Sequence, residues 1–118
     1  MANPYIQLNI DPQYINKQFI LKIFKDNTPL IRCFFYLNNL PYTPSDEFSV
    51  YLAYSDNEIV HDYEYMEGTI TDNYCEFDIE DDFFEEEGDF YTQIYLKSDD
   101  KQIVFAHGTT RVLGSIFD

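Results

Sequence analysis

The side chains of this chain that could do chemistry are two histidines, two cysteines and a run of acids. His61 and His107 are its only histidines, and Cys33 and Cys75 are its only cysteines. A zinc site needs at least three converging ligands, and no spaced set of Cys and His is present. We therefore expect no metal and no cofactor, and interpret His61 and His107 as surface or hydrogen-bonded histidines.

Nucleophilic catalysis is not indicated either. Cys33 lies within Leu30–Leu37, the most apolar run of the chain. Burial in such a run raises the pKa of a thiol and makes it unreactive. The serines lack the neighbouring glycines of a nucleophile elbow. We expect no acyl-transfer enzyme.

Many carboxylates crowd into the segment between Asp78 and Asp89. Glycosidases need two carboxylates held across a cleft, one of them with a pKa raised by burial. A crowded acidic corner provides neither feature. Calcium is a second alternative, but the spaced acids and closing Glu of a calcium loop are missing. The segment is interpreted as a solvated loop, and we expect no enzyme activity.

Exposed tyrosines are the remaining signal. If the apolar positions of 90–97 face inward, the alternation of a strand turns Tyr91 and Tyr95 outward, and Tyr63 and Tyr65 are expected to do the same. Tyrosines supply contact area at interfaces and also stack on sugars. We predict Tyr63, Tyr65, Tyr91 and Tyr95 as interaction residues. The alternative is ordinary cross-strand pairing on a sheet surface.

The elements that position these side chains are strands. Apolar and polar residues alternate in segments separated by turn signals about every ten residues, a spacing typical of a β-sandwich. The only helical candidate is one turn at 81–86. We predict an all-β, immunoglobulin-like antiparallel sandwich of seven or eight strands. These are Tyr5–Ile10, 19–25, Leu30–Leu37, 48–54, 59–66, 69–79, 90–97 and 103–112.

Composition limits the class of protein and of partner. The chain has 118 residues, of which 45% are hydrophobic and 19% aromatic, too rich for disorder despite a net charge of -15. We expect one domain spanning 1–118. So acidic a surface disfavours nucleic acid and anionic membranes as partners. A basic protein partner remains open, as does the alternative that the charge only keeps an aromatic chain soluble.

The N-terminus has no basic region followed by an apolar run, and no segment approaches the ~20 apolar residues of a membrane span. We expect synthesis in the cytoplasm. Cys33 and Cys75 both lie on the apolar sides of their segments, which suggests an inter-sheet disulfide. Free buried thiols are the favoured alternative because no secretion signal is seen.

The order of the motifs resembles a known family. Asp26-Asn27-Thr28-Pro29 precedes an apolar strand, Asn38-Asn39-Leu40-Pro41 follows it, and the acidic corner leads into a strand that begins near Phe90. Over about 18–112 this resembles the immunoglobulin-like N-terminal domain of the phage baseplate upper protein and related virion modules. Asn39-Leu40 stands where that family has Asn-Gly, and Phe90 where it favours Tyr.

The resemblance implies a structural protein of the phage virion, of head-fibre, capsid-decoration or baseplate type. It implies binding to capsid, tail or baseplate proteins, homo-oligomers, and a final location in the virion after synthesis in the host cytoplasm. The alternative is a carbohydrate-binding adhesion module that contacts the host surface through the same tyrosines.

Overall fold

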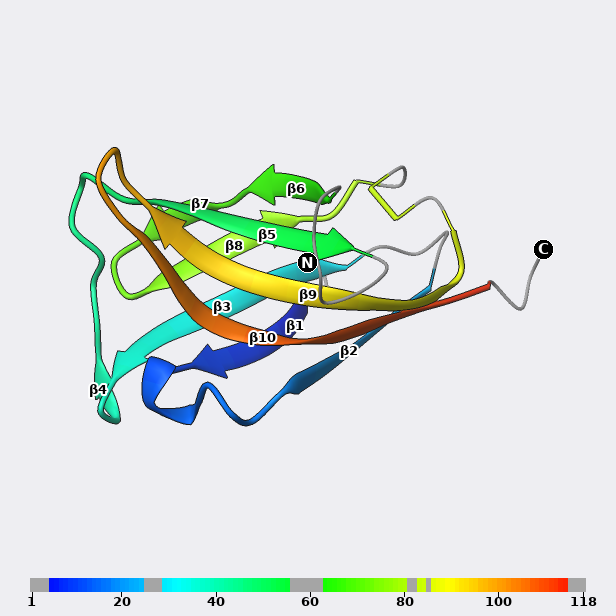
Figure 1. Cartoon of the computed structure of the whole chain (residues 1–118), viewed down its shortest axis with the longest axis horizontal. Coiled ribbons are helices and arrows are strands. Elements are labelled where there is room, and N and C mark those ends of the chain that lie inside the picture. Colours follow the sequence, from blue (N-terminus) through cyan, green and yellow to red (C-terminus); the bar gives the residue numbers. More distant parts are fainter. Residues whose placement is uncertain (1–4, 25–28, 56–62, 81–82, 85, 115–118) are drawn as a thin grey trace.

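The computed structural model consists of two five-stranded sheets that pack face to face as a β-sandwich (Figure 1). It describes residues 5–24, 29–55, 63–80, 83–84 and 86–114. The elements are β1 (Tyr5–Ile10), the 3-10 helix η1 (Pro12–Tyr14), β2 (Phe19–Phe24), β3 (Leu30–Leu37), β4 (Leu40–Pro41), β5 (Ser49–Ser55), β6 (Glu64–Glu67), β7 (Thr69–Thr71), β8 (Tyr74–Asp78), β9 (Gly88–Lys97) and β10 (Gln102–Leu113). In this part of the chain, no helix is long and apolar enough to cross a membrane.

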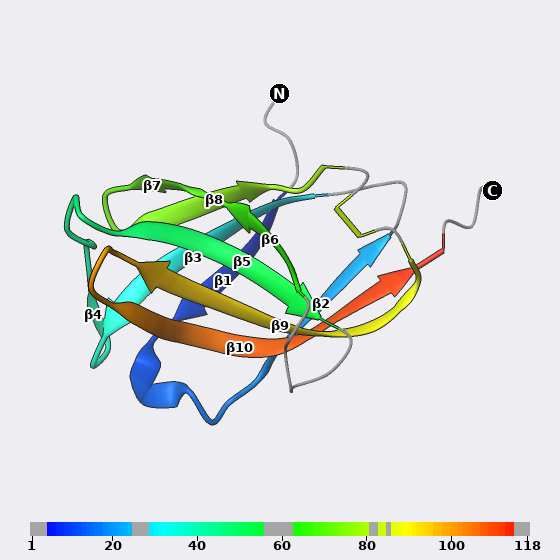
Figure 2. The ribbon, with the colours of Figure 1, turned by 45° about the horizontal axis from the view of Figure 1, so that its top comes forward.

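One sheet, called sheet A, has the order β1-β3-β8-β7, with β4 paired to β3. The other, sheet B, has the order β2-β10-β9-β5-β6. The consecutive strands β1 and β2 belong to different sheets, and η1 lies in the connection between them (Figure 2). This first part of the chain therefore contributes one edge strand to each sheet.

The core lies between the sheets and is built from the inward side of each strand. Period-two alternation buries every second residue of β3 and β9. The fully buried side chains include Ile31, Phe35, Val50, Leu52, Phe77, Ile94 and Leu96. In the middle of β9 the buried hydroxyl of Thr92 lies 2.7 Å from that of Thr110 on β10. This hydrogen bond satisfies two polar groups that would otherwise destabilise an apolar layer.

The acidic corner is anchored by aromatic rings. Tyr54 packs against Phe83, Phe84 and Phe90 with ring centroids 5.0, 4.5 and 5.2 Å away, and its hydroxyl donates to the carbonyl of Phe83. Phe83 and Phe84 are not helical, and the rest of the predicted turn at 81–86 lies partly outside the described residues. The described part of the corner is therefore held by aromatic packing against the core and is not a helical turn.

The predicted all-β sandwich is confirmed, but its sheets are mixed rather than purely antiparallel. β1 pairs in parallel with β3, and β2 in parallel with β10. Alternation along a strand has the same period in both kinds of pairing, so it cannot distinguish them. The described residues form ten strands rather than seven or eight.

The extra strands come from short segments and from one missed turn. The predicted strand 69–79 is a hairpin of β7 and β8, with Asp72 in the left-handed region at φ 51°. Asp and Asn favour such turns because their side chains hydrogen-bond to nearby backbone groups. The predicted strand 59–66 lies partly outside the described residues, and its last three residues belong to β6 (Glu64–Glu67).

The turn between β3 and β4 shows why two asparagines stand together. Asn38 and Asn39 have φ values of 51° and 68°, and Leu37 pairs with Leu40 across them. A two-residue hairpin turn of type I′ needs both central residues in the left-handed region, which Asn tolerates better than most non-glycine residues. The backbone N–H of Asn39 also donates to Asp11 over 2.8 Å. Burial acts to raise the pKa of Asp11, but the hydrogen bonds from Asn39 and Gln13 lower it below its ordinary value.

The two cysteines face each other within one sheet. Cys33 on β3 is the register partner of Cys75 on β8, and both are buried free thiols. The inter-sheet disulfide is excluded because both residues belong to sheet A, and free thiols agree with the favoured prediction. A hydrogen bond with Cys75 and burial raise the pKa of the Cys33 thiol well above its ordinary value.

Gly108 allows β2 to join sheet B. It pairs with Phe19 in the parallel ladder between β10 and β2, and a Cβ placed on it would lie 2.0 Å from the Phe19 carbonyl oxygen. No real side chain fits at that distance. The sequence predicts no such constraint, because it depends on which strand lies beside β10.

We expect Gly108→Ala to lower the free energy of unfolding by about 3 kcal/mol, since β2 must shift away from β10 to make room. Urea denaturation of both proteins measures this. Thr109→Ala, one residue further on, is the control and should change stability by less than about 1 kcal/mol. Equal unfolding midpoints for Gly108→Ala and the parent would contradict the close approach.

Candidate interaction surface

Five tyrosines cover part of the outer side of sheet B. Tyr51 lies on β5, Tyr65 on β6, and Tyr91 and Tyr95 on β9, while Tyr63 precedes β6. The register places Tyr51 opposite Tyr95, and Tyr65 opposite Ala53. We call this set, Tyr51, Tyr63, Tyr65, Tyr91 and Tyr95, the tyrosine face. It exists because tyrosines of three neighbouring segments turn to the same side of the pleat.

Four of these rings form one connected cluster. Tyr51 stacks on Tyr95 with centroids 5.4 Å apart and an interplanar angle of 22°. Tyr65 contacts Tyr51 and Tyr63, in both cases with centroids 5.9 Å apart. Such contacts contribute about 0.5–1.5 kcal/mol per pair beyond the area they bury. The cluster is therefore a preformed platform rather than a set of independent side chains.

Tyr95 lies at the bottom of this cluster. Its side chain turns outward as predicted, yet only 7% of the residue is exposed because its neighbours cover it. Burial, the nearby hydroxyls of Tyr63, Tyr51 and Tyr65, and a hydrogen bond with Tyr63 raise the pKa of Tyr95 to about 12. Tyr95 therefore supports the platform and is itself poorly accessible.

The fifth tyrosine is held by a hydrogen-bonded chain. The Nε2 of His107 lies 2.6 Å from the carbonyl oxygen of Ile15, so Nε2 must be the donor. In the neutral ring the Nδ1 then accepts from the Tyr91 hydroxyl, 3.3 Å away, and Tyr91 accepts from the Gln93 amide over 3.3 Å. This chain fixes the orientation of the Tyr91 ring. His107 is thus the hydrogen-bonded histidine that was expected, whereas His61 lies outside the described residues.

A shallow hollow of about 270 Å³ opens within the tyrosine face. Its described lining combines ring surface with hydroxyl and amide groups: Ala53, Ser55, Tyr63, Tyr91, Gln93, Tyr95 and Gln102. None of these side chains carries a charge at neutral pH, although a quarter of the chain's residues are charged. The hollow suits a neutral polar group that presents an apolar side.

The predicted site residues thus fall into two groups. Tyr63 and Tyr65 are exposed, at 48% and 58%, whereas Tyr91 is half-buried and Tyr95 is buried. The structure brings all four to one face of sheet B. Tyr51 was not predicted, although its place between the buried Val50 and Leu52 turns it outward in the same way.

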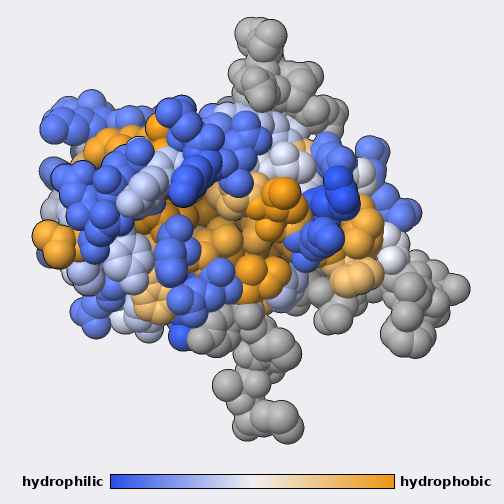
Figure 3. Space-filling view, turned by 90° about the horizontal axis from the view of Figure 1, so that it is seen from below, coloured by the Kyte–Doolittle hydropathy of each residue, from blue (hydrophilic) through white to orange (hydrophobic). Residues whose placement is uncertain are grey.

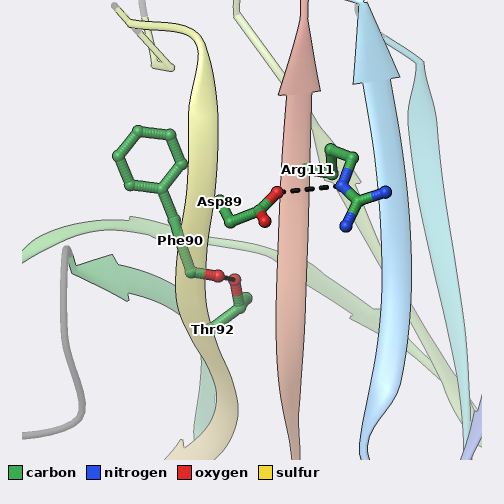
Figure 4. Close-up of polar contacts among 4 residues, drawn as sticks. All are labelled: Asp89, Phe90, Thr92 and Arg111. Atoms are coloured by element: carbon green, nitrogen blue, oxygen red, sulfur yellow. Dashed lines mark hydrogen bonds and ion pairs between the residues drawn. The ribbon is translucent and has the colours of Figure 1, made fainter.

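The acids of the corner do not gather into a site within the described residues. Glu80, Glu86, Glu87 and Asp89 are exposed, and no three His, Cys, Asp or Glu side chains in the described ranges converge as metal ligands. Asp89 accepts from the Nε of Arg111 on β10 over 2.9 Å (Figure 4). Asp89 therefore forms an ion pair across two strands. Figure 4 also shows the Thr92 hydroxyl, which donates to the Phe90 carbonyl.

Comparison with known proteins shows a shared fold but no match to a protein family. No protein-family model matches the sequence. No curated protein matches it either. The fold is shared with a phage domain. The N-terminal domain of phage TP901-1 ORF48 superimposes with a TM-score of 0.67 at 8% sequence identity, over 92% of this chain and 98% of that one. At this identity the likeness is one of fold, and it agrees with the sandwich expected from the sequence resemblance.

The raised pKa of Tyr95 predicts a measurable loss of stability at alkaline pH. Its pKa is about 12 in the folded protein and about 10 when unfolded. The folded state therefore retains this proton more strongly, so the free energy of unfolding falls as pH rises from about 10 to about 12. Urea denaturation across this range should show a shallower decline for Tyr95→Phe. Tyr14→Phe, on η1, is the control and should decline like the parent; an equal slope for Tyr95→Phe would contradict the assignment.

Proposed function

We propose that this chain is a non-enzymatic structural module of a phage particle, of head-fibre, capsid-decoration or baseplate type. The observation that carries the proposal is its likeness in fold to a phage domain over nearly the whole length of both chains. The sequence resemblance to phage virion modules supports the same role. The module binds neighbouring virion proteins and copies of itself, and works in the virion after synthesis in the host cytoplasm.

The tyrosine face provides the mechanism of binding. Tyr63 and Tyr65 present large rings to solvent, and the stacked pair Tyr51 and Tyr95 holds them in place. Rings fixed in this way lose little side-chain entropy when a partner covers them. The acidic remainder of the surface orients the module toward a basic partner and makes nucleic acid and anionic membranes poor ones.

A role without catalysis fits the placement of the reactive groups. The two thiols are buried, so they cannot reach a substrate. The described acids of the corner are exposed, so none of them has the buried setting that the acid of a glycosidase needs. We therefore propose that binding is the whole activity of the chain.

Purified particles test the proposal. In phage carrying the gene in its own genome, quantitative mass spectrometry should detect the protein in gradient-purified virions at a fixed copy number. The double variant Tyr63→Ala with Tyr65→Ala should bind its virion partner at least ~30-fold more weakly, since two interface tyrosines contribute about 1 kcal/mol each. Its copy number in purified virions should therefore fall.

Leu40→Ala is the matched control, because Leu40 is 69% exposed but lies on β4 of sheet A, away from the tyrosine face. Its copy number should equal that of the parent. Absence of the protein from normally assembled virions would overturn the virion role. Equal incorporation of parent and double variant would instead overturn the role of the tyrosine face.

The hollow favours a second candidate, a carbohydrate-binding adhesion module. Its volume of about 270 Å³ lies just below the ~300–1,000 Å³ of small-molecule sites, so it would accept about one sugar ring. The ring of Tyr63 would stack on the apolar side of the sugar, and Gln93 and Gln102 would hydrogen-bond its hydroxyls.

Isothermal titration with neutral hexoses and a glycan array separates this candidate from the first. The adhesion module predicts saturable sugar binding that Tyr63→Ala abolishes and Tyr14→Ala leaves intact. Tyr14 is the control because it is also exposed but lies on η1. Lack of binding by the folded chain to every glycan tested would eliminate the adhesion module.

A further inference from the structure

Sheet B ends in two strands that have one neighbour each. Among the described residues, β2 pairs only with β10, and β6 only with β5. The outer edge of such a strand presents unpaired N–H and C=O groups that can accept a strand from another chain. Proteins often protect these edges with charges, so the side chains on them indicate whether an edge is blocked or available.

The β2 edge presents apolar groups around one cation. Ile20 and Phe24 are exposed, at 68% and 43%, and Lys22 lies between them on the same side of the strand. The side of the molecule where β1, η1 and β2 lie shows apolar surface across its middle (Figure 3). With one cation between two exposed apolar side chains, this edge remains available to a strand of opposite charge.

The charge of Lys22 is uncompensated within the described residues. Its register partner on β10 is Arg111, which is itself a cation and is already bound by Asp89 at 2.9 Å. No described carboxylate forms an ion pair with Lys22. In a chain of net charge -15, a positive strand edge next to another cation favours an acidic partner.

The β6 edge has the complementary character. Its outward residues are Tyr65, 58% exposed, and the exposed Glu67, which lies opposite Tyr51. No described Lys or Arg forms an ion pair with Glu67. This edge therefore offers an aromatic ring and an anion where the β2 edge offers an apolar ring and a cation.

The directions of the strands allow the two edges to meet. β2 runs parallel to β10, β10 antiparallel to β9, β9 antiparallel to β5, and β5 antiparallel to β6. It follows that β2 and β6 run in opposite directions. When a second copy extends the sheet in the same orientation, its β2 lies antiparallel to β6, the more stable kind of pairing.

We propose that copies of this chain associate head to tail, with β2 of one copy adding to β6 of the next. Lys22 then lies opposite Glu67, and the same antiparallel register brings Phe24 opposite Tyr65. The proposal rests on the assembly role above and names the partner as a second copy. Pairing β2 with β2 would oppose two lysines, and β6 with β6 two glutamates, so only the head-to-tail contact relieves both charges. Such a contact closes into a ring or continues as a fibre.

Charge reversal tests the contact directly. By sedimentation velocity, the mean mass of the parent should rise with concentration. Lys22→Glu and Glu67→Lys should each weaken association at least ~10-fold, because each places like charges opposite one another. The double variant should restore it. Lys101→Glu is the matched control, since it makes the same charge change in the connection between β9 and β10 and should associate like the parent.

Unfolding midpoints show whether each variant is folded. If Lys22→Glu does not fold, Lys22→Gln is measured in its place. A parent that stays monomeric at every concentration would overturn the proposal, as would a double variant no stronger than either single variant. The role in the virion is tested separately. A monomer that still enters particles would overturn self-association alone, whereas an oligomer absent from particles would overturn the virion role alone.

Discussion

The rest of the structure depends on which residues of β9 face the core and which face outward. The inward residues Phe90, Thr92, Ile94 and Leu96 are buried, while Tyr91, Gln93 and Tyr95 turn to the other side. A slip of one residue would exchange the core for the tyrosine face. The hydrogen bond between Thr92 and Thr110 opposes such a slip, because the slip would turn Thr92 outward and leave the hydroxyl of Thr110 unpaired in an apolar layer, at a cost of about 1–3 kcal/mol. One strand thus sets both the stability of the sandwich and the surface that binds.

The tyrosine face combines stability with exposure through the nature of its side chains. The ring of Tyr95 is buried as a core residue would be, yet it belongs to the outer side of the sheet. Tyr51, Tyr63 and Tyr65 surround it, and on the same face the hydroxyl of Tyr91 hydrogen-bonds to Gln93 and His107. Phenylalanine at these positions would create an apolar patch prone to aggregation, whereas tyrosine leaves a soluble surface that a partner can still bury.

The sequence predicted what depends on periodicity and missed what depends on the order of strands in space. Alternation predicted β1 and β3 to the residue and the outward direction of Tyr91 and Tyr95. It could not reveal the parallel pairs of β1 with β3 and of β2 with β10, since the neighbours of a strand are not encoded in its own pattern. The clearance at Gly108, the facing of Cys33 and Cys75 within one sheet, and the burial of Tyr95 under Tyr51 all depend on those neighbours. The hairpin at Asp72 was missed although its turn residues were visible.

The parallel ladder between β2 and β10 also determines how the module responds to mechanical load. β2 lies near the beginning of the described chain and β10 at its end, and six residue pairs join them, from Gly108 with Phe19 to Leu113 with Phe24. A force applied just before β2 and just after β10 pulls β2 backward at its first residue and β10 forward at its last. Because the strands are parallel, this force shears the whole ladder at once instead of opening its hydrogen bonds one after another. A sandwich loaded across this ladder would therefore resist stretching far better than one whose loaded strands are paired antiparallel.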